Sequence, residues 1–468
     1  MKLPLLDLLV FLAYLIGMML FGCSFMLKKD ARSSAAFTSG SGHLPAWAIG
    51  MSIFATFVSS ISFLGLPAKA YASNWNAFVF SLSIPVASVI AVKFFVPLYR
   101  SLNSISAYHY LELRFGAWAA VYASACYLLT QLARIGTILY LLALPMHVLL
   151  GWSVPLIITI AALSVLVYSV AGGIQAVIWT DAVQGILLIA GTVLCLLLLI
   201  WGNPPGAFSE AWQAHKFSLG SFSVWEWQHE TFWVCLLYGI FINLQNYGID
   251  QNYVQRYLTA KNTREAVQST LFGSLLYIPV SFLFFAMGTA LYGYYRVHPL
   301  PEAVAKTPDQ VLPYFIVNGL PQGVTGLLIA AIFAAGMSTI STSINSGATI
   351  LFTDYYRRFW APAATERAQL RFLRWATLAS IFSGGMLGLF LLGYCSRRAT
   401  RGPAMIATLL GILVIVWIVA GTHRFFGLPC PLHPNLAIVM GTLVIFLVGF
   451  GLATWAQRKT RASVRTNG

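Results

Sequence analysis

Six hydroxyl-bearing side chains crowd one short stretch of an apolar part of the chain. The stretch MSTISTSINS begins at position 337 and directly follows LLIAAIFAAG. Hard cations bind through several oxygen ligands, whereas small hydroxylated residues also suit the close packing of two membrane helices. A packing seam does not need six hydroxyl groups in ten residues, which favours the cation. The six residues are Ser338, Thr339, Ser341, Thr342, Ser343 and Ser346.

A second polar interruption lies in the segment ATFVSSISFLGLP at 55–67. Three serines occur there with Gly65 and Pro67; proline removes a backbone donor and glycine weakens a helix. One interpretation is a proline kink whose serines hydrogen-bond back to their own helix. The other is a broken helix whose freed carbonyl groups face a cation. The segment alone does not decide between them.

Two of the charged residues inside apolar segments stand out. Asp181 lies just inside the start of one, where the helix dipole favours a carboxylate; alternatively, it is a counter-charge for a bound cation. Arg134 lies in the middle of another, where an arginine costs ~2.5–3.5 kcal/mol on insertion scales. It either pairs with backbone carbonyl groups of another helix or captures an anionic group of a substrate, and we favour substrate capture.

The elements that must position these residues are membrane helices. The chain has 468 residues, of which 59% are hydrophobic and 9% charged, whereas soluble domains have about 25% charged residues. Apolar runs of about 20 residues, long enough to span a bilayer, recur throughout, so we expect a single transmembrane domain over 1–468. The twelve expected spans are 5–26, 45–72, 77–99, 116–149, 154–171, 176–201, 231–253, 266–294, 311–352, 370–394, 403–423 and 435–456.

The basic residues indicate the topology. With odd-numbered connections on one side, 21 of the 28 Lys and Arg residues lie on that side, which is then cytoplasmic and leaves the N-terminus outside. The net charge of +15 is therefore a consequence of topology, and we expect no nucleic-acid partner. LFGC at 20–23 resembles a lipoprotein cleavage site, but the long apolar run with Asp7 favours a retained first helix.

An enzyme is disfavoured. The six cysteines form no CxxC pair, the eight histidines form no HExxH motif, and no histidine lies mid-membrane beside a carboxylate. We also expect no attached signalling module, because the chain ends 12 residues after its last expected helix.

Several separate stretches, in this order, carry a family resemblance. They are FATFVSSISF, LPAKAY, ISAYHYLELRFG, GGIQAVIWTDAVQG, VQRY and AAIFAAGMSTISTSINS. From residue 1 to about 375, the chain resembles the sodium:solute symporter family, and within it the bacterial sialic-acid symporter branch.

The resemblance implies an all-α fold of two inverted five-helix repeats with extra N- and C-terminal helices. Binding sites are then expected at mid-membrane, where the first core helix is unwound. We expect a leading helix and loop at 1–43, a first repeat at 44–202, a second repeat at 230–402, and a C-terminal helix pair with a basic tail at 403–468.

The family also implies binding residues at matching positions. For one sodium ion, they are the backbone carbonyl groups of Ala55, Val58 and Ala335 and the hydroxyl groups of Ser338 and Thr339. For the second sodium ion of the sialic-acid branch, they are Asp181, Ser338, Ser341 and Thr342. For the substrate, they are Phe57, Ser59, Ser60, Ser62, Ala77, Ser81, Arg134, Phe241, Asn243 and Gln245.

Arg134 matches the carboxylate clamp of the branch, but three substrate positions depart from its pattern. Phe57 replaces a threonine, Ser81 a glutamine and Ala77 an aromatic residue. The resemblance implies sodium-coupled import of a small organic anion across the bacterial inner membrane by a monomer. Sialic acid or a related carboxylated sugar is the expected substrate; another solute, or a transport-inactive homologue, is the alternative.

One region is shorter than the family pattern. Both flanks of 370–402 are basic, so two spans are expected between them, yet only about 22 apolar residues are present, enough for one. We therefore predict that the fold is one helix short near 370–394, that this region is distorted or re-entrant, and that the C-terminal tail is cytoplasmic.

Overall fold

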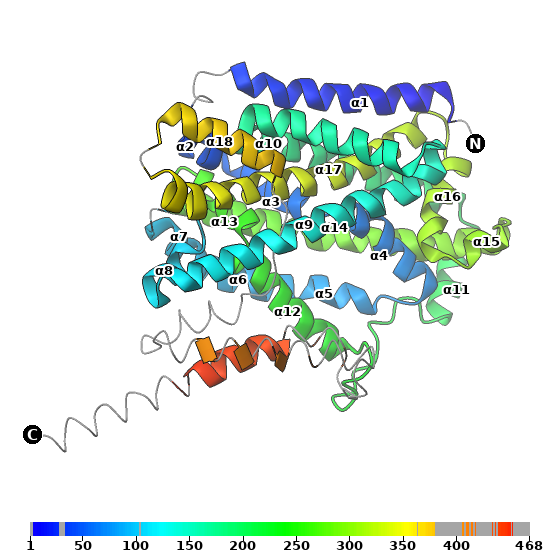
Figure 1. Cartoon of the computed structure of the whole chain (residues 1–468). Helices are drawn as coiled ribbons and strands as arrows, with labels where there is room; N and C mark the ends of the chain where they lie inside the picture. The colour runs from blue at the N-terminus through cyan, green and yellow to red at the C-terminus, as the bar shows by residue number, and fades with distance from the viewer. Residues whose placement is uncertain are drawn as a thin grey trace, which may run out of the picture.

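The computed structural model is almost wholly helical (Figure 1). It describes residues 3–27, 33–102, 104–362, 364–379 and 439–450, with isolated positions between 405 and 452. Within these residues there is no β-strand, and a single isolated bridge pairs Leu44 with Ala260. The predicted all-α fold is confirmed.

The first half of the chain begins with α1, which lies along one edge of the bundle in Figure 1. Three helices, α5 to α7, join through one π-helical turn into the single apolar span Asn76–Ser101. The helices are α1 Leu5–Ser24, α2 Ser34–Ser39, α3 Ala46–Phe57, α4 Ser60–Ala72, α5 Val79–Leu82, α6 Ile84–Ile90, α7 Val96–Ser101, α8 His109–Phe115, α9 Ala117–Leu150, α10 Val154–Gly202 and α11 Ala207–Gln213.

The 49-residue helix α10 is two helices joined at Gly173. This glycine has φ 55° and ψ −148°, and a Cβ there would lie 2.7 Å from the carbonyl oxygen of Phe37. Only glycine tolerates such backbone angles and such a close approach. The kink separates the two spans predicted at 154–171 and 176–201.

The second half contains the long helices α14 and α17. The elements are α12 Phe232–Ile249, α13 Gln251–Thr259, α14 Thr263–Val297, α15 Glu302–Ala305, α16 Val311–Asn318, α17 Val324–Ile350, the π-helical continuation η7 Leu351–Trp360, and α18 Glu366–Ala379. In both halves, one helix is followed after a short extended break by a second. The break lies at Val58 and Ser59 between α3 and α4, and at Asp250 between α12 and α13.

In the described part of the chain, seven helices are long and apolar enough to span a membrane, or eight if the bent pair α3–α4 counts as one span. Since α10 covers two predicted spans, these helices account for every span predicted before residue 353. One boundary was wrong: the predicted span 311–352 is divided into α16 and α17, because the chain turns at Gly319–Gly323. The predicted spans 403–423 and 435–456, the missing helix near 370–394 and the tail lie wholly or largely outside the described residues.

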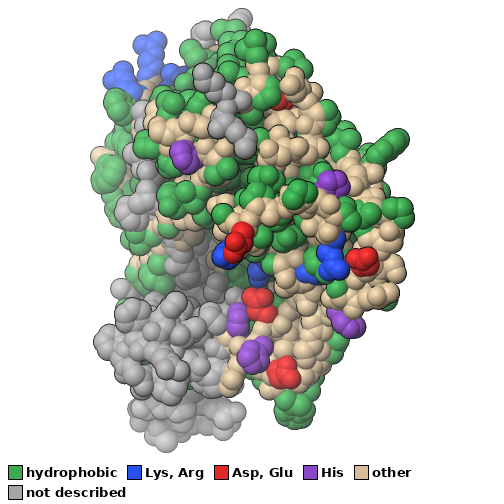
Figure 2. Space-filling model, turned by 90° about the vertical axis from the view of Figure 1, so that its right-hand side faces the viewer, with side chains coloured by type: hydrophobic (Ala, Val, Ile, Leu, Met, Phe, Trp, Pro, Cys, Tyr) green, Lys and Arg blue, Asp and Glu red, His purple; other side chains and the backbone are tan. Residues whose placement is uncertain are grey.

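Apolar side chains cover much of the surface, as Figure 2 shows for one face. Exposed examples on the long helices include Leu129 at 52%, Leu163 at 55% and Leu197 at 58%. Soluble monomers rarely expose large contiguous apolar patches, so this surface fits a lipid environment. The protein is a multi-pass membrane protein.

Helix α17 lies at the centre of the bundle, and every residue from Leu328 to Ile350 is buried. Glycines on α14 let that helix press against the broken pair. A Cβ at Gly273 would lie 2.3 Å from the carbonyl oxygen of Gly50 on α3, and one at Gly288 would lie 2.2 Å from that of Pro67 on α4. Small residues allow membrane helices to approach closely, so α14 packs tightly against both α3 and α4.

The buried acid of the first helix caps α17. Asp7, only 1% exposed, accepts hydrogen bonds at Oδ1 from the backbone N–H groups of Gly323 (2.7 Å) and Gly326 (2.8 Å). A carboxylate satisfies the free N–H groups at a helix N-terminus and interacts favourably with the helix dipole. Asp7 therefore fixes one end of the helix that carries the hydroxyl run.

We expect Asp7→Ala to lower the melting temperature of the detergent-purified protein, because two buried hydrogen bonds are lost. The expected loss in free energy of unfolding is about 1–3 kcal/mol, measured by intrinsic fluorescence on heating. The matched control is Asp309→Ala, which removes an exposed carboxylate of the short 3-10 helix Pro308–Gln310. Equal melting temperatures for the two variants would contradict the capping role.

Candidate functional site

The chain leaves helical geometry between α3 and α4. Val58 (φ −80°, ψ 119°) and Ser59 (φ −110°, ψ 169°) are extended, and the helices on either side bend by 58°. The Ser59 hydroxyl accepts a bond from the Ser62 N–H (3.3 Å) and so caps α4. Pro67 lies inside α4, beyond the break, so the alternative of a proline kink does not account for the bend.

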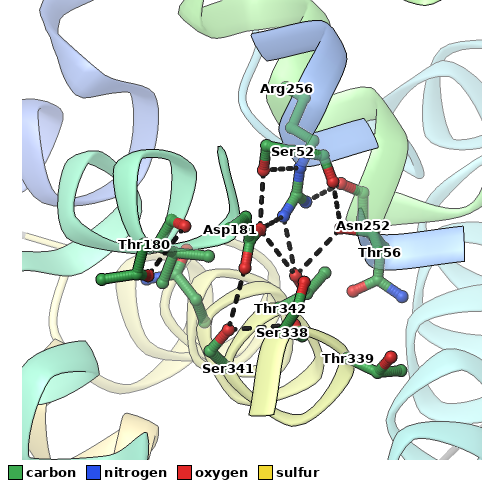
Figure 3. A network of polar contacts seen from close by, with 12 residues as sticks. Ser52, Thr56, Thr180, Asp181, Asn252, Arg256, Ser338, Thr339, Ser341 and Thr342 are labelled. Carbon is green, nitrogen blue, oxygen red and sulfur yellow. Dashed lines mark hydrogen bonds and ion pairs between the residues drawn. The ribbon is translucent and has the colours of Figure 1, made fainter. Parts of the chain in front are cut away.

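A buried ion pair joins four helices beside this break (Figure 3). Arg256 Nη2 of α13 lies 2.7 Å from Asp181 Oδ2 of α10, and their side chains are 1% and 0% exposed. Arg256 Nε donates to Ser52 Oγ of α3 (2.8 Å), and this hydroxyl donates to the same Asp181 oxygen (2.6 Å). Nη2 also donates to Thr342 Oγ1 of α17 (2.7 Å). One carboxylate thus organises α3, α10, α13 and α17.

The residues predicted for a second cation gather around Asp181. The Ser341 hydroxyl lies 3.4 Å from Asp181 Oδ1, and Thr342 Oγ1 lies 3.5 Å from Oδ2. Ser338 Oγ is buried and has no hydrogen-bond partner among the described residues. Arg256 and Ser52 already occupy Oδ2, whereas Oδ1 has a single long contact. The space beside Oδ1 and Ser338 is therefore the part of this cluster with oxygen ligands still available.

The residues predicted for the first cation lie between α17 and the helix break. The Thr339 hydroxyl lies 3.4 Å from the carbonyl oxygen of Val58 and 3.1 Å from that of Ala335. Ala55 and Ser338, the other two members, are also buried. The structure therefore brings Thr339, Ala335 and Val58 together at one contact between α17 and the unwound backbone. The role of Ala55 and Ser338 in a cation site stays a prediction.

A cavity of about 340 Å³ opens beside the break. Its walls combine aromatic rings with a few polar groups. Phe57 stacks on Tyr247 (ring centroids 5.6 Å apart) and meets Tyr277 edge-on (4.5 Å). The lining residues are Phe57, Ser62, Leu66, Lys69, Ala77, Phe80, Ser81, Arg134, Glu230, Cys235, Tyr238, Asn246, Tyr253 and Tyr277.

Arg134 is half-buried and lines this cavity. Its Nη2 donates to the carbonyl oxygen of Thr56 at 3.4 Å, just before the break. The predicted carbonyl partner on another helix is therefore present, yet a single long bond leaves most of the five guanidinium donors for other groups. Both interpretations of Arg134 are compatible with this geometry.

Only half of the residues predicted for the substrate reach the cavity: Phe57, Ser62, Ala77, Ser81 and Arg134 do so, and Ser59, Ser60, Phe241, Asn243 and Gln245 do not. On α12, the lining residues Cys235, Tyr238 and Asn246 share one helical face. Asn243 lies on another face and donates instead to Ser83 Oγ (2.9 Å).

Several polar groups of the site escaped prediction. Arg256 was assigned to a cytoplasmic connection from charge patterning, although its stretch VQRY is among those that carry the family resemblance. Ser52 and Thr56 looked like ordinary helix residues. Ser52 and Thr56 lie six and two residues before Val58, where the break begins. Because they are four residues apart, they share one face of α3, and this spacing is the signal that the sequence offers.

The family model for the sodium:solute symporter family matches residues 37–382. The chain belongs to this family. It is therefore a sodium-coupled solute symporter. It is 32% identical to the sodium/sialic acid symporter SiaT of Proteus mirabilis over 466 residues, which cover 93% of each chain. It is also 32% identical to the sodium/sialic acid symporter NanT of Aliivibrio fischeri, over 94% of this chain and 91% of that one.

Solved structures support the same fold. The structure of a Na⁺-coupled sialic acid symporter in a substrate-bound outward-open state matches with a TM-score of 0.89 and 31% identity, over 97% of this chain and 98% of that one. Mhp1, a nucleobase-cation-symport-1 family transporter, matches with a TM-score of 0.60 at 15% identity over 93% of this chain and 96% of that one, which supports the fold alone. The predicted inverted-repeat transporter fold is confirmed.

The buried ion pair predicts a large effect of Arg256→Gln. Removing one partner leaves an uncompensated charge at Asp181, at a cost of about 3–5 kcal/mol, so the melting temperature in potassium buffer should fall strongly. The double variant with Asp181→Asn should recover most of the loss. The control is Arg296→Gln, which breaks a surface pair with Glu210 whose side chains are both 56% exposed. An Arg256→Gln loss no larger than that of the control would contradict the account.

Proposed function

We propose that this symporter imports sialic acid or a related carboxylated sugar, together with sodium, across the bacterial inner membrane. The observation that carries the proposal is the charge of the cavity. Lys69 and Glu230 lie 3.3 Å apart and neutralise each other, so Arg134 is the remaining charged side chain among the described lining residues. The carboxylate of Asp250, which is not part of the lining, interacts electrostatically with Arg134 from behind the cavity wall. A guanidinium group that faces a cavity at mid-membrane favours an anionic solute.

The walls suit a carboxylate attached to a sugar-sized body. Arg134 offers a planar donor pair to a carboxylate, and the cavity of about 340 Å³ is within the size range of small-molecule sites. Hydroxyl and amide groups of Ser62, Tyr277 and Asn246 offer hydrogen bonds. The sialic-acid substrate named for the relatives from Proteus mirabilis and Aliivibrio fischeri fits this combination.

The two clusters around α17 are our proposed sodium sites. The first comprises the carbonyl groups of Ala55, Val58 and Ala335 with Ser338 and Thr339. The second comprises Asp181, Ser338, Ser341 and Thr342. Both sets consist of oxygen atoms, as a hard cation requires. Arg256 already balances Asp181, so we propose that the second ion binds on the Oδ1 side, beside Ser338 and Ser341.

The helix break links the ion to the solute. Val58 belongs to the first proposed sodium site, and its neighbours Phe57 and Ser62 line the cavity. Sodium bound between α17 and the break fixes the unwound backbone in the conformation that binds the solute. We expect a coupling free energy of about 1–3 kcal/mol, with the ion and the solute each raising the affinity for the other.

A second candidate substrate is a smaller, less polar carboxylate. Phe57 occupies the position where the sialic-acid branch has threonine, and Phe80 and Tyr238 add aromatic surface. Sodium-coupled monocarboxylate transporter 1 of Homo sapiens is 26% identical over 86% of this chain and 72% of its own length. The aromatic wall is the observation that favours this class.

Uptake into proteoliposomes tests the proposal. We expect an inward sodium gradient to drive accumulation of labelled N-acetylneuraminate, whereas an equal potassium gradient should not. Accumulation of a short monocarboxylate alone would support the second candidate. No sodium-driven uptake of either compound would support the transport-inactive alternative.

Arg134→Ala should reduce uptake of the carboxylate at least about 100-fold, because each charge-assisted bond contributes about 1.5–3 kcal/mol. Arg134→Lys should recover little, since a single ammonium does not reproduce the planar donor pair. Initial rates over a range of substrate concentrations measure both effects. Near-normal uptake by Arg134→Lys would contradict carboxylate capture by the guanidinium group.

Asp181→Asn should lower the number of sodium ions coupled to each solute. We expect the Hill slope for sodium in reconstituted uptake to fall from about 2 to about 1, since one of two cooperating ions is lost. The control is Asp309→Asn, which removes the charge of an exposed acid in the short 3-10 helix Pro308–Gln310. An unchanged slope in Asp181→Asn would exclude the second site.

We further propose that the protein acts as a monomer in the lipid bilayer, with its N-terminus outside, and that it has no enzymatic activity and no nucleic-acid partner. The distribution of basic residues supports the orientation.

A further inference from the structure

Asp354 is a buried acid without a buried cation beside it. It lies on the π-helical segment η7 and is 8% exposed. Ser106 Oγ donates to its Oδ2 and Thr353 Oγ1 to its Oδ1, each at 3.0 Å. Within the described residues, no ion pair includes Asp354. Neutral hydroxyl donors compensate a buried carboxylate only partly, so this site favours a positive ligand.

The comparison with the two other buried acids sharpens this point. Asp181 is balanced by Arg256, and Asp7 by two N–H groups at the positive end of α17. Asp354 instead lies near the opposite end of the same continuous helix, where the helix dipole offers a carboxylate no stabilisation. π-Helical turns are rare and occur frequently at functional sites.

Asp354 faces a cavity of about 390 Å³. Two of the basic side chains around this cavity are accounted for. Arg358 donates to both oxygens of Glu112, at 2.6 and 3.0 Å, and Arg357 is exposed and lies over the Phe352 ring, 5.9 Å from its centroid. The remaining oxygen atoms, from Ser104, Ser106, Thr353 and Asp354, form a ligand set suited to a hard monovalent cation.

A continuous polar face of α17 and η7 connects this cavity with the Asp181 cluster. Its members recur every three or four residues, so they lie on one side of the helix. They are Ser338, Ser341, Thr342, Asn345, Ser346, Thr349 and Thr353. At 1.5 Å per residue, Thr342 and Asp354 are about 18 Å apart along the axis.

Buried polar atoms without partners lie along this face. In the described part of the chain, Ser338 Oγ and Asn345 Nδ2 on this face, and Asn252 Nδ2 of α13, are inaccessible to solvent and make no hydrogen bond. Such atoms usually signal ordered water or a ligand that the protein binds transiently. Gln255 of α13 closes the face by donating to Asn345 Oδ1 and Thr349 Oγ1, both at 3.0 Å.

We propose that Asp354, Ser106 and Thr353 form a cytoplasmic-side cation site that receives sodium after it leaves Asp181. The ion moves along the polar face of α17 once α13 withdraws, and Asp354 then releases it to the cytoplasm. Arg357, Arg358 and the arginines of α18 mark this end as cytoplasmic. The inference rests on the proposed sodium symport.

Right-side-out proteoliposomes test this site. Net uptake of labelled N-acetylneuraminate is measured with increasing sodium inside, and solute exchange is measured with equal sodium and solute on both sides. Asp354→Asn should raise the internal sodium concentration that halves net uptake by about tenfold, because a charged ligand is lost. Exchange should remain near wild type, since it does not require sodium to leave the protein, and this also shows that the variant is folded.

Two matched variants complete the design. Asp354→Glu keeps the charge and should resemble wild type, and Glu112→Gln removes the other acid of the same cavity and should leave the internal sodium dependence unchanged. An unchanged internal sodium dependence in Asp354→Asn, or an equal loss of net uptake and exchange, would overturn the proposal. If wild-type protein shows no sodium-driven uptake, the proposed substrate fails instead. Sodium binding on the internal side is then measured directly with ²²Na⁺. Equal sodium affinity in wild type and Asp354→Asn would overturn the site.

Discussion

The buried contact between Asp181 and Arg256 is the constraint on which the rest of the membrane core depends. The two side chains lie 2.7 Å apart and are almost fully buried, so each makes the burial of the other tolerable. Ser52, Asn252 and Thr342 accept hydrogen bonds from three of the four other donors of the guanidinium group. Because these residues come from α3 and α10 in the first half of the chain and from α13 and α17 in the second half, the contact fixes how the two halves meet.

This ion pair also limits where sodium binds. The carboxylate oxygen Oδ2 already accepts from Arg256 and Ser52, whereas the Ser341 hydroxyl of α17 lies on the Oδ1 side. The broken helix α3–α4 passes beside the same face of α17 and continues into the wall of the solute cavity. In the proposed arrangement, ion and solute act on one stretch of unwound backbone, which gives a physical route for their coupling without contact between them.

The sequence predicted the features that depend on local pattern. Apolar run length identified the spans, and hydroxyl groups at helical spacing in an apolar stretch identified α17. Prediction failed where tertiary contacts decide. Arg256 looked like a loop residue because α13 is short and polar, and its burial depends on Asp181, 75 positions earlier. The substrate role implied for Asn243 stays a prediction: Asn243 does not line the cavity, and the family resemblance does not specify the rotation of α12. The predicted span 311–352 is divided by the turn at Gly319–Gly323. A prediction based on apolar content alone does not detect this turn, because the residues on both sides of it are apolar.

The central claim is that sodium at the helix break and a carboxylate at Arg134 stabilise each other. The most direct test is equilibrium binding of N-acetylneuraminate to the purified protein by calorimetry, in sodium and in choline, together with sodium binding with and without the solute. The account predicts that sodium tightens solute binding at least about fivefold and that the solute tightens sodium binding by the same factor, as linkage requires. Equal solute affinity in sodium and in choline would contradict it.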